Sequence, residues 1–176
     1  MNRAHSLAPG SDLKPANVFL DHDNNVLIGD FGLSERFDPS CNAIEARPGT
    51  LHYSAPETFI GGVMVNGPEL DVWSAGVVLY VMMRGRYPFW GKSDRETMTA
   101  ISMHEPEWPS KHFPPDAVDL LKRMLRKSPY QRISIAAIKR HPFVRDEIAA
   151  QTKAIAASSA LERKRQQMLR QMLLVP

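Results

Sequence analysis

The sequence predicts a mainly α-helical fold with one small β-hairpin. The clearest observation is the segment 71–83, DVWSAGVVLYVMM, in which Asp71 and Ser74 are the only polar residues. A helix that is apolar on every side is buried in a protein core or in lipid. The twelve residues that follow Asp71 are too few to cross a bilayer, which needs about 20. We therefore expect a central core helix, with Trp73, Leu79 and Met82 among its buried side chains.

The hairpin is predicted by two short apolar runs, 18–20 and 26–28, that flank the polar segment 21–25, DHDNN. Two short strands joined by turn-forming residues are typical of an antiparallel hairpin. The stretch 33–53 is polar and interrupted by proline and glycine, so we expect a long loop there. Loops of that length in a compact domain are usually functional or disordered.

Further helices are expected after the central one. Ser93 followed by Glu96 has the form of a capping box, so a helix should run from there to about Met103. Asp116 is expected to cap a helix whose apolar positions recur at helical spacing. Ser134 should begin a last short helix before the His-Pro pair at 141–142.

Composition describes an ordinary globular protein of one domain, or one lobe of a larger one. The chain has 176 residues, of which 43% are hydrophobic and 23% charged. Its net charge of +3 does not by itself indicate a nucleic-acid partner. The single cysteine, Cys41, excludes an internal disulfide framework, and residues 1–11 lack the apolar region of a secretory signal. We therefore expect a protein of the cytoplasm or nucleus with no transmembrane segment.

Four motifs occur in order along the chain: DLKPAN at 12–17, DFG at 30–32, GTLHYSAPE at 49–57, and DVWSAGVVLY at 71–80. In this order they resemble the C-terminal lobe of a protein kinase over residues 12–144. The resemblance implies a kinase-like C-lobe with the hairpin beside its catalytic loop, and with the N-lobe absent from these residues. Residues 1–11 would then be a leader without a match, and residues 145–176 a basic helical tail.

This resemblance implies ATP and Mg²⁺ as cofactors and assigns four site residues. Asp12 resembles the catalytic-loop aspartate, which orients the substrate hydroxyl and accepts its proton. Lys14 would reach the γ-phosphate, where a fixed cation offsets developing charge. Asn17 and Asp30 resemble the magnesium ligands, and oxygen donors suit that hard cation.

The kinase type is also implied by the motifs. Lys14, in Asp-Leu-Lys-Pro-x-Asn, is similar to the serine/threonine pattern, and Thr50 resembles the threonine that bonds the catalytic aspartate and lysine. The stretches 67–74, GPELDVWS, and 87–90, YPFW, look most like the calcium/calmodulin-dependent and AMP-activated group. The implied substrate is a serine or threonine of another protein.

Structural supports are implied for five more residues. Glu57 is expected to form a buried ion pair with Arg132. Asp71 is expected to hold the backbone of the catalytic loop near residues 10–12, because a carboxylate at the start of an apolar helix needs donors. Phe31 and Gly32 complete the DFG motif.

The sequence departs from the family in three places. The long helix that normally packs beside the central one is not among these residues, so part of the apolar surface of Val77–Val81 is expected to lack a cover. Gly-Ser-Asp at 10–12 replaces the usual His-Arg-Asp, so the arginine that clamps a phosphorylated loop is missing and Ser40 is disfavoured as a phosphosite. The 176 residues also contain no G-x-G-x-x-G loop and no strand lysine of the V-A-I-K type. We therefore expect this chain alone to be catalytically inactive. The alternatives are a non-catalytic protein-binding module, a pseudokinase, or a truncated product.

The segment 161–172, LERKRQQMLRQM, is basic, and Leu161, Met168 and Met172 share one face of a helix. Such a helix is compatible with binding to calmodulin or to a membrane surface. A solvated helical extension is the simpler alternative.

Overall fold

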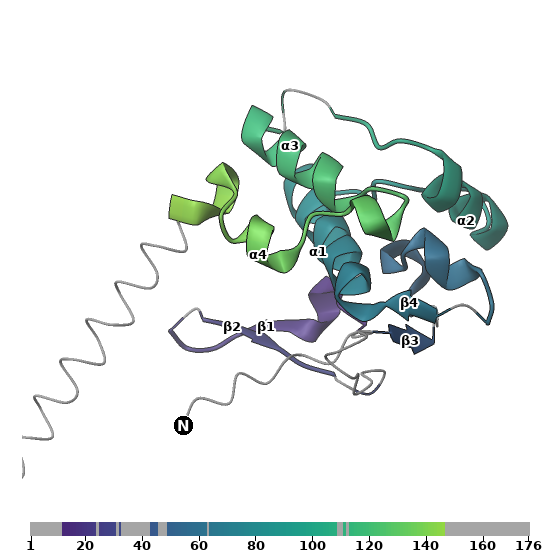
Figure 1. Ribbon diagram of the computed structural model, residues 1–176. Helices are drawn as coiled ribbons and strands as arrows, with labels where there is room; N and C mark the ends of the chain where they lie inside the picture. The colour runs from purple at the N-terminus through teal and green to yellow at the C-terminus, as the bar shows by residue number, and fades with distance from the viewer. Residues whose placement is uncertain are drawn as a thin grey trace, which may run out of the picture. The chain divides into compact units, whose positions relative to one another are not determined.

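The computed structural model describes residues 12–23, 25–30, 32, 43–45, 49–62, 64–108, 111 and 113–146 (Figure 1). The chain divides into two compact units, Met1–Ile135 and Ala136–Pro176. Nearly all described elements belong to the first unit. In chain order they are η1 (Pro15–Asn17), β1 (Val18–Leu20), β2 (Val26–Ile28), β3 (Ala43–Glu45), η2 (Leu51–Tyr53), η3 (Pro56–Phe59), β4 (Met64–Asn66), α1 (Gly67–Arg84), α2 (Asp94–Met103), α3 (Pro115–Met124), η4 (Pro129–Gln131) and α4 (Ile135–Ile138).

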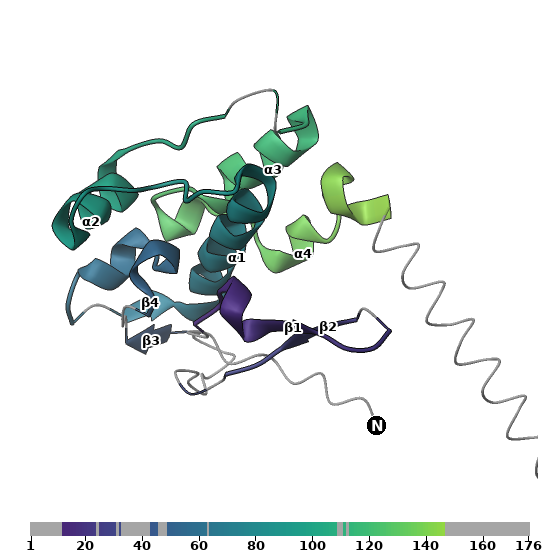
Figure 2. The ribbon, with the colours of Figure 1, turned by 180° about the vertical axis from the view of Figure 1, so that it is seen from behind.

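The predicted central helix is α1. It begins at Gly67, earlier than predicted, and ends at Gly85, whose φ of 74° is the left-handed conformation that terminates many helices. Trp73 and Val77 are fully buried at 0% exposure. Figures 1 and 2 both place η1 beside the N-terminal end of α1, so the first motif and this helix are neighbours.

The expectation that Met82 is a core residue is wrong. Met82 is 75% exposed, and Leu79 is only half-buried. α1 packs against α3, η2 and η4, and these leave part of its surface uncovered. The sequence pattern could not show this, because it reports the polarity of a face and not what lies against it. No helix among the described residues is both long and apolar enough to span a membrane.

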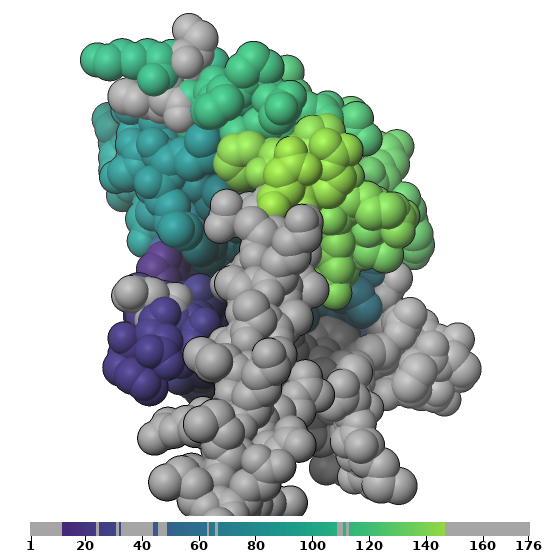
Figure 3. All heavy atoms as spheres, turned by 90° about the vertical axis from the view of Figure 1, so that its left-hand side faces the viewer, coloured from purple at the N-terminus to yellow at the C-terminus, as the bar shows by residue number. Residues whose placement is uncertain are grey.

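The predicted hairpin is confirmed. β1 and β2 are antiparallel, with Val18 opposite Ile28. The side chain of Asp21 shapes the turn, since its Oδ1 accepts the N–H of Asp23 at 2.9 Å and of Asn25 at 2.8 Å. Figure 3 shows this hairpin at the surface of the molecule. Most of its apolar side chains are exposed: Phe19 (54%), Leu20 (63%), Val26 (60%), Leu27 (53%) and Ile28 (37%).

The loop predicted for residues 33–53 is wrong in part, because it contains a strand. Ala43–Glu45 pairs antiparallel with β4 to form a second two-stranded sheet, with Ile44 opposite Val65. Both side chains are buried and belong to the core cluster that contains Trp73. A lone isoleucine in a polar stretch gives no strand pattern, and its partner strand lies beyond two 3-10 helices.

The remaining helices follow the predictions with one correction. α2 ends at Met103 as expected, and the Ser93 hydroxyl accepts the N–H of Glu96 at 3.2 Å. The N-cap position of α3 is Pro114, which makes no side-chain capping bond, and Asp116 lies inside the first turn. Pro115 occupies the first helical position, where its missing N–H has no intrahelical partner to lose. α4 begins directly after Ser134, as predicted.

The second unit is described from 136 to 146. Residues 142–146 are helical, and the N–H groups of Val144 and Arg145 donate to the carbonyl oxygen of His141. The predicted basic helix at 161–172, and most of the tail at 145–176, lie outside the described residues. The leader at 1–11, Ser40 and Cys41 lie outside them as well.

Candidate active site

Asp12, Lys14 and Thr50 form a compact polar cluster. The backbone N–H of Thr50 donates to Asp12 Oδ1, and its hydroxyl donates to Asp12 Oδ2, each at 2.8 Å. The Lys14 ammonium donates to the same Oδ2 and to Thr50 Oγ1, the latter at 2.9 Å. Asp12 and Lys14 precede η1, whereas Thr50 precedes η2. Two segments far apart in the sequence therefore fix one carboxylate.

The environment of Asp12 keeps its carboxylate ionised. Burial raises the pKa of this group, but the hydrogen bonds from Lys14 and Thr50 outweigh burial and hold the pKa below its ordinary value. The side chains of Lys14 and Asp12 are only 26% and 11% exposed, so the pair is partly shielded from water. At neutral pH the cluster presents an oriented acceptor next to a fixed cation.

Asn17 and Asp30 lie at the same end of the β1–β2 hairpin. The N–H of Gly29 donates to the carbonyl oxygen of Asn17 at 2.9 Å, which continues the strand register to this end. Asn17 is buried, and its side-chain nitrogen donates to the carbonyl oxygen of Asp12 at 2.9 Å. This bond orients the amide, so that its oxygen is the atom left for a cation.

Asp30 has an unusual backbone for a residue other than glycine. Its φ is 58°, in the left-handed region that aspartate tolerates better than most side chains. Its Oδ1 accepts the N–H of Gly32 at 3.2 Å, and its side chain is exposed. Strained backbone of this kind concentrates at functional sites. Phe31, the middle residue of the motif, lies outside the described residues.

Gly49 is a site residue that the sequence analysis did not single out. A Cβ at this position would lie 2.8 Å from Asp12 Oδ1, closer than real Cβ atoms approach such a neighbour. Only glycine lets the chain bring the Thr50 amide onto the carboxylate. The sequence signal that could have indicated its role is its place directly before Thr50 in the motif GTLHYSAPE at 49–57.

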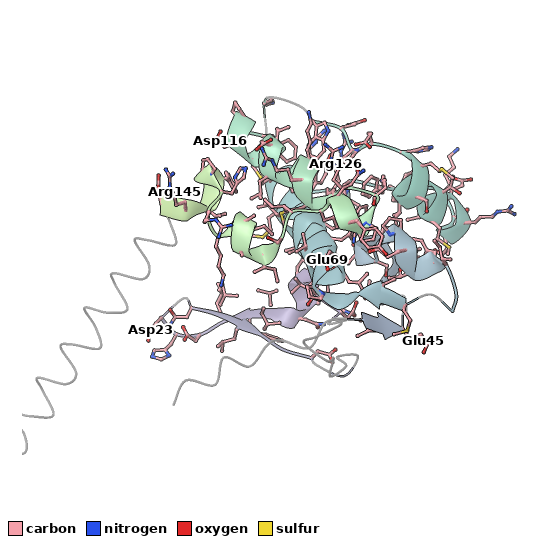
Figure 4. The ribbon with its side chains drawn as sticks, in the orientation of Figure 1. Asp23, Glu45, Glu69, Asp116, Arg126 and Arg145 are labelled. Atoms are coloured by element: carbon pink, nitrogen blue, oxygen red, sulfur yellow. The ribbon has the colours of Figure 1, made fainter. Side chains whose placement is uncertain are left out.

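The supporting ion pair is present. Arg132 and Glu57 form a bidentate pair, with Nη2 to Oε2 at 2.7 Å and Nη1 to Oε1 at 2.5 Å. Their side chains are 0% and 8% exposed. Arg132 also donates to the carbonyl oxygen of Glu69 in α1, a residue labelled in Figure 4. The pair therefore joins η3 to η4 and to the start of α1.

The role of Asp71 stays a prediction. It lies half-buried in the first half of α1, but residues 10 and 11 of the expected contact lie outside the described part of the chain. Asp71 does have interacting partners. The structure thus brings together Asp12, Lys14, Asn17 and Thr50, and places Asp30 at the adjoining end of the hairpin.

The helical body with its small antiparallel hairpin fits part of a protein kinase domain. The chain belongs to the protein kinase domain family, whose model matches residues 10–144. It is 35% identical over 147 residues to the serine/threonine-protein kinase GRIK1 of Arabidopsis thaliana, covering 84% of this chain and 36% of that protein.

Other relatives are similar at the same level. Calcium-dependent protein kinase 25 of Arabidopsis thaliana is 37% identical over 77% of this chain and 26% of its own length. The carbon catabolite-derepressing protein kinase of Candida glabrata is 43% identical over 78% of this chain and 22% of its own length. The chain thus spans about a third or less of these relatives. Its resemblance to the calcium/calmodulin-dependent and AMP-activated group of serine/threonine kinases is confirmed.

Proposed function

We propose that this chain supplies the catalytic loop and the magnesium ligands of an ATP-dependent protein serine/threonine kinase. The reaction transfers the γ-phosphoryl group of ATP to the hydroxyl of a serine or threonine in another protein. The cluster of Asp12, Lys14 and Thr50 carries the proposal, because it combines an ionised acceptor with a fixed cation. Phosphoryl transfer is catalysed largely by positioning and by electrostatic stabilisation, and this cluster is suited to both.

Each residue of the cluster has a distinct task. Asp12 accepts a hydrogen bond from the substrate hydroxyl, orients its oxygen toward the phosphorus, and receives its proton. Thr50 fixes the carboxylate through both oxygens. Lys14 offsets the negative charge on the transferred phosphoryl group, and its hydrogen bonds to Asp12 and Thr50 keep the ammonium beside the acceptor.

Asn17 and Asp30 would hold Mg²⁺. An amide oxygen and a carboxylate are the donors that this hard cation takes, and the hairpin register brings the two residues to one end of the sheet. When bound, the ion neutralises charge on the phosphates of ATP. The backbone of Asp12 supports this cation site, because its carbonyl oxygen accepts the Asn17 side-chain N–H and so orients that amide.

The glycine-rich loop and the strand lysine that cover ATP in the family are not among these 176 residues. We therefore propose that turnover requires residues outside them, and that the 176-residue chain alone does not phosphorylate substrates. A non-catalytic protein-binding module is the second candidate. The exposed apolar side chains of the hairpin favour it, since surface of this kind marks interaction sites.

The test compares the 176-residue chain with the complete product of its gene, here called the full-length protein, in a magnesium- and ATP-dependent assay on a serine/threonine peptide library. We expect the full-length protein to transfer phosphate, and Asp12→Asn and Asp30→Asn to abolish transfer. Asp116→Asn, at the exposed start of α3 (Figure 4), is the matched control and should stay active. A full-length protein that binds partners without any transfer supports the second candidate instead. Transfer by the 176-residue chain that Asp30→Asn abolishes would show that the expected inactivity is wrong.

A further inference from the structure

The two strands of the β3–β4 sheet flank Thr50 along the chain, β3 shortly before it and β4 after it. Ile44 and Val65 face each other in its register and are 5% and 7% exposed. Both belong to the core cluster with Tyr53 and Trp73. β4 runs directly into α1, so β3 is attached to the N-terminal end of the central helix. Glu45, labelled in Figure 4, is the last residue of β3 and is exposed.

The sheet limits where Thr50 can lie. Residues 46–48 alone separate Glu45 from Gly49, and a fully extended chain spans at most about 3.6 Å per residue. Gly49 therefore lies within about 14 Å of the end of β3 by chain length alone. On its other side Thr50 leads into η2, where the carbonyl oxygen of Tyr53 accepts the Ser74 hydroxyl of α1 at 2.9 Å. The segment that bears Thr50 is thus attached to α1 at both ends.

We propose that Ile44 and Val65 are positioning residues for phosphoryl transfer, because their pairing holds Gly49 and Thr50 on the Asp12 carboxylate. The inference rests on the proposed function, and it concerns how the acceptor is oriented. A contact between residues 38 positions apart closes a long loop, which costs conformational entropy. The β3–β4 sheet fixes the end of β3 relative to α1 and leaves only three residues between it and Gly49, so the two Thr50 hydrogen bonds form with less further ordering of the chain.

The proposal distinguishes Ile44 from its neighbours in the same sheet. Met64 occupies the next register pair, opposite Glu45, but it is 60% exposed and packs little. Met64→Ala is therefore a matched control that keeps the backbone ladder. Ile44→Val is the conservative variant, because it keeps a β-branched side chain in the buried position.

The first measurement is amide hydrogen exchange in the full-length protein. The Thr50 N–H donates to Asp12 Oδ1, so its exchange rate reports the contact directly. We expect Ile44→Ala to speed Thr50 exchange at least tenfold relative to an α1 amide such as Val77. Met64→Ala should leave the ratio of the Thr50 exchange rate to the Val77 exchange rate unchanged. Ile44→Val should keep this ratio close to its wild-type value. Equal acceleration of Thr50 and Val77 would reduce Ile44 to a purely structural residue and overturn the proposal.

The second measurement is the separate determination of kcat and KM for the same variants. Loss of the Thr50 hydrogen bonds leaves the Asp12 carboxylate free to rotate but removes no contact with the substrate, so Ile44→Ala should lower kcat and leave KM nearly unchanged, as in Thr50→Val.

A kcat that falls only in proportion to the folded fraction of the protein, or a KM that rises while kcat is unchanged, contradicts the proposal. If Ile44→Ala does not fold, Val65→Thr takes its place, because it introduces a buried hydroxyl with nearly the same shape. A wild-type protein without kinase activity would defeat the proposed function alone. The exchange experiment would still decide whether the sheet positions Thr50.

Discussion

Thr50 donates its backbone N–H and its hydroxyl to the two carboxylate oxygens of Asp12, 38 positions earlier in the chain, each at 2.8 Å. A carboxylate held through both oxygens cannot rotate about its terminal bond without losing a hydrogen bond to an ionised acceptor. Lys14 bonds to both residues and closes the cluster. The orientation of the Asp12 carboxylate is therefore set by contacts among these described residues.

Removing the Thr50 hydroxyl should slow phosphate transfer. In Thr50→Val the hydroxyl bonds to Asp12 and Lys14 are lost while the side-chain shape is kept. A hydrogen bond to a charged group contributes about 1.5–3 kcal/mol, which corresponds to a fall in kcat/KM of about ten- to hundredfold. Steady-state kinetics of the full-length protein with a peptide substrate measures this effect.

Two variants control that experiment. Thr50→Ser keeps the hydroxyl and should retain most of the activity. Thr99→Val removes an exposed hydroxyl of α2, which among the described residues donates to the Arg95 carbonyl oxygen of the same helix. Equal rates for Thr50→Val and Thr99→Val would show that the Thr50 hydroxyl does not orient the acceptor.

Gly49→Ala should disturb the same contact from the backbone side. The added methyl group would lie 2.8 Å from Asp12 Oδ1, so either the carboxylate moves or the Thr50 amide withdraws. We expect a loss of activity of at least tenfold with only a small change in melting temperature. Gly61→Ala is the control, because a Cβ there meets nothing within 4 Å. Unchanged kinetics in Gly49→Ala would mean that the close approach is not needed.

Breaking the Glu57–Arg132 pair should destabilise the fold. Glu57→Ala leaves a buried guanidinium whose other donors reach only carbonyl oxygens, those of Glu69, Arg126 and Lys127. Removal of one partner of a buried pair costs about 3–5 kcal/mol in the free energy of unfolding. Urea denaturation followed by circular dichroism measures this cost.

The exposed pair of Arg86 and Glu107 is the control for that prediction. Its side chains are 56% and 74% exposed, and surface pairs contribute at most about 1 kcal/mol. Glu107→Ala should therefore change the unfolding midpoint little, and less still at high salt. Similar losses for Glu57→Ala and Glu107→Ala would contradict the prediction for the buried pair.

Local sequence patterns predicted the hairpin, the core of α1 and the start of α2 because each of these depends on neighbouring residues. Ser93 and Glu96 are three positions apart, and the turn at Asp21 is closed by residues two and four positions later. The roles proposed for Asp12 and Lys14 come from the resemblance to the family motifs, because spacing alone could not assign them.

The features that the sequence analysis missed depend on contacts between distant segments. Ile44 becomes a strand residue only because β4 lies beside it. The exposure of Met82 depends on which elements cover α1, and the need for glycine at position 49 depends on where Asp12 lies. Asp116 failed as a cap for a local reason, because Pro115 competes for the first helical position.

The stability of the protein should rise with pH between about 8 and 10.5 through Lys127. Its ammonium donates to the Ile101 carbonyl oxygen at 2.6 Å and lies 3.7 Å from the centre of the Phe89 ring. Burial lowers the pKa of Lys127 from 10.5 to about 8, although the charge of Glu105 opposes this shift. Between these pH values the unfolded chain binds a proton that the folded chain has released, so the free energy of unfolding increases as pH rises.

Lys127→Met removes this titrating group. The unfolding free energy of the wild type minus that of Lys127→Met, measured by urea denaturation at pH 7.5, 9 and 10, should therefore increase with pH. The subtraction cancels the titration of tyrosines common to both proteins, and a constant difference across the series would show that Lys127 keeps an ordinary pKa in the folded chain.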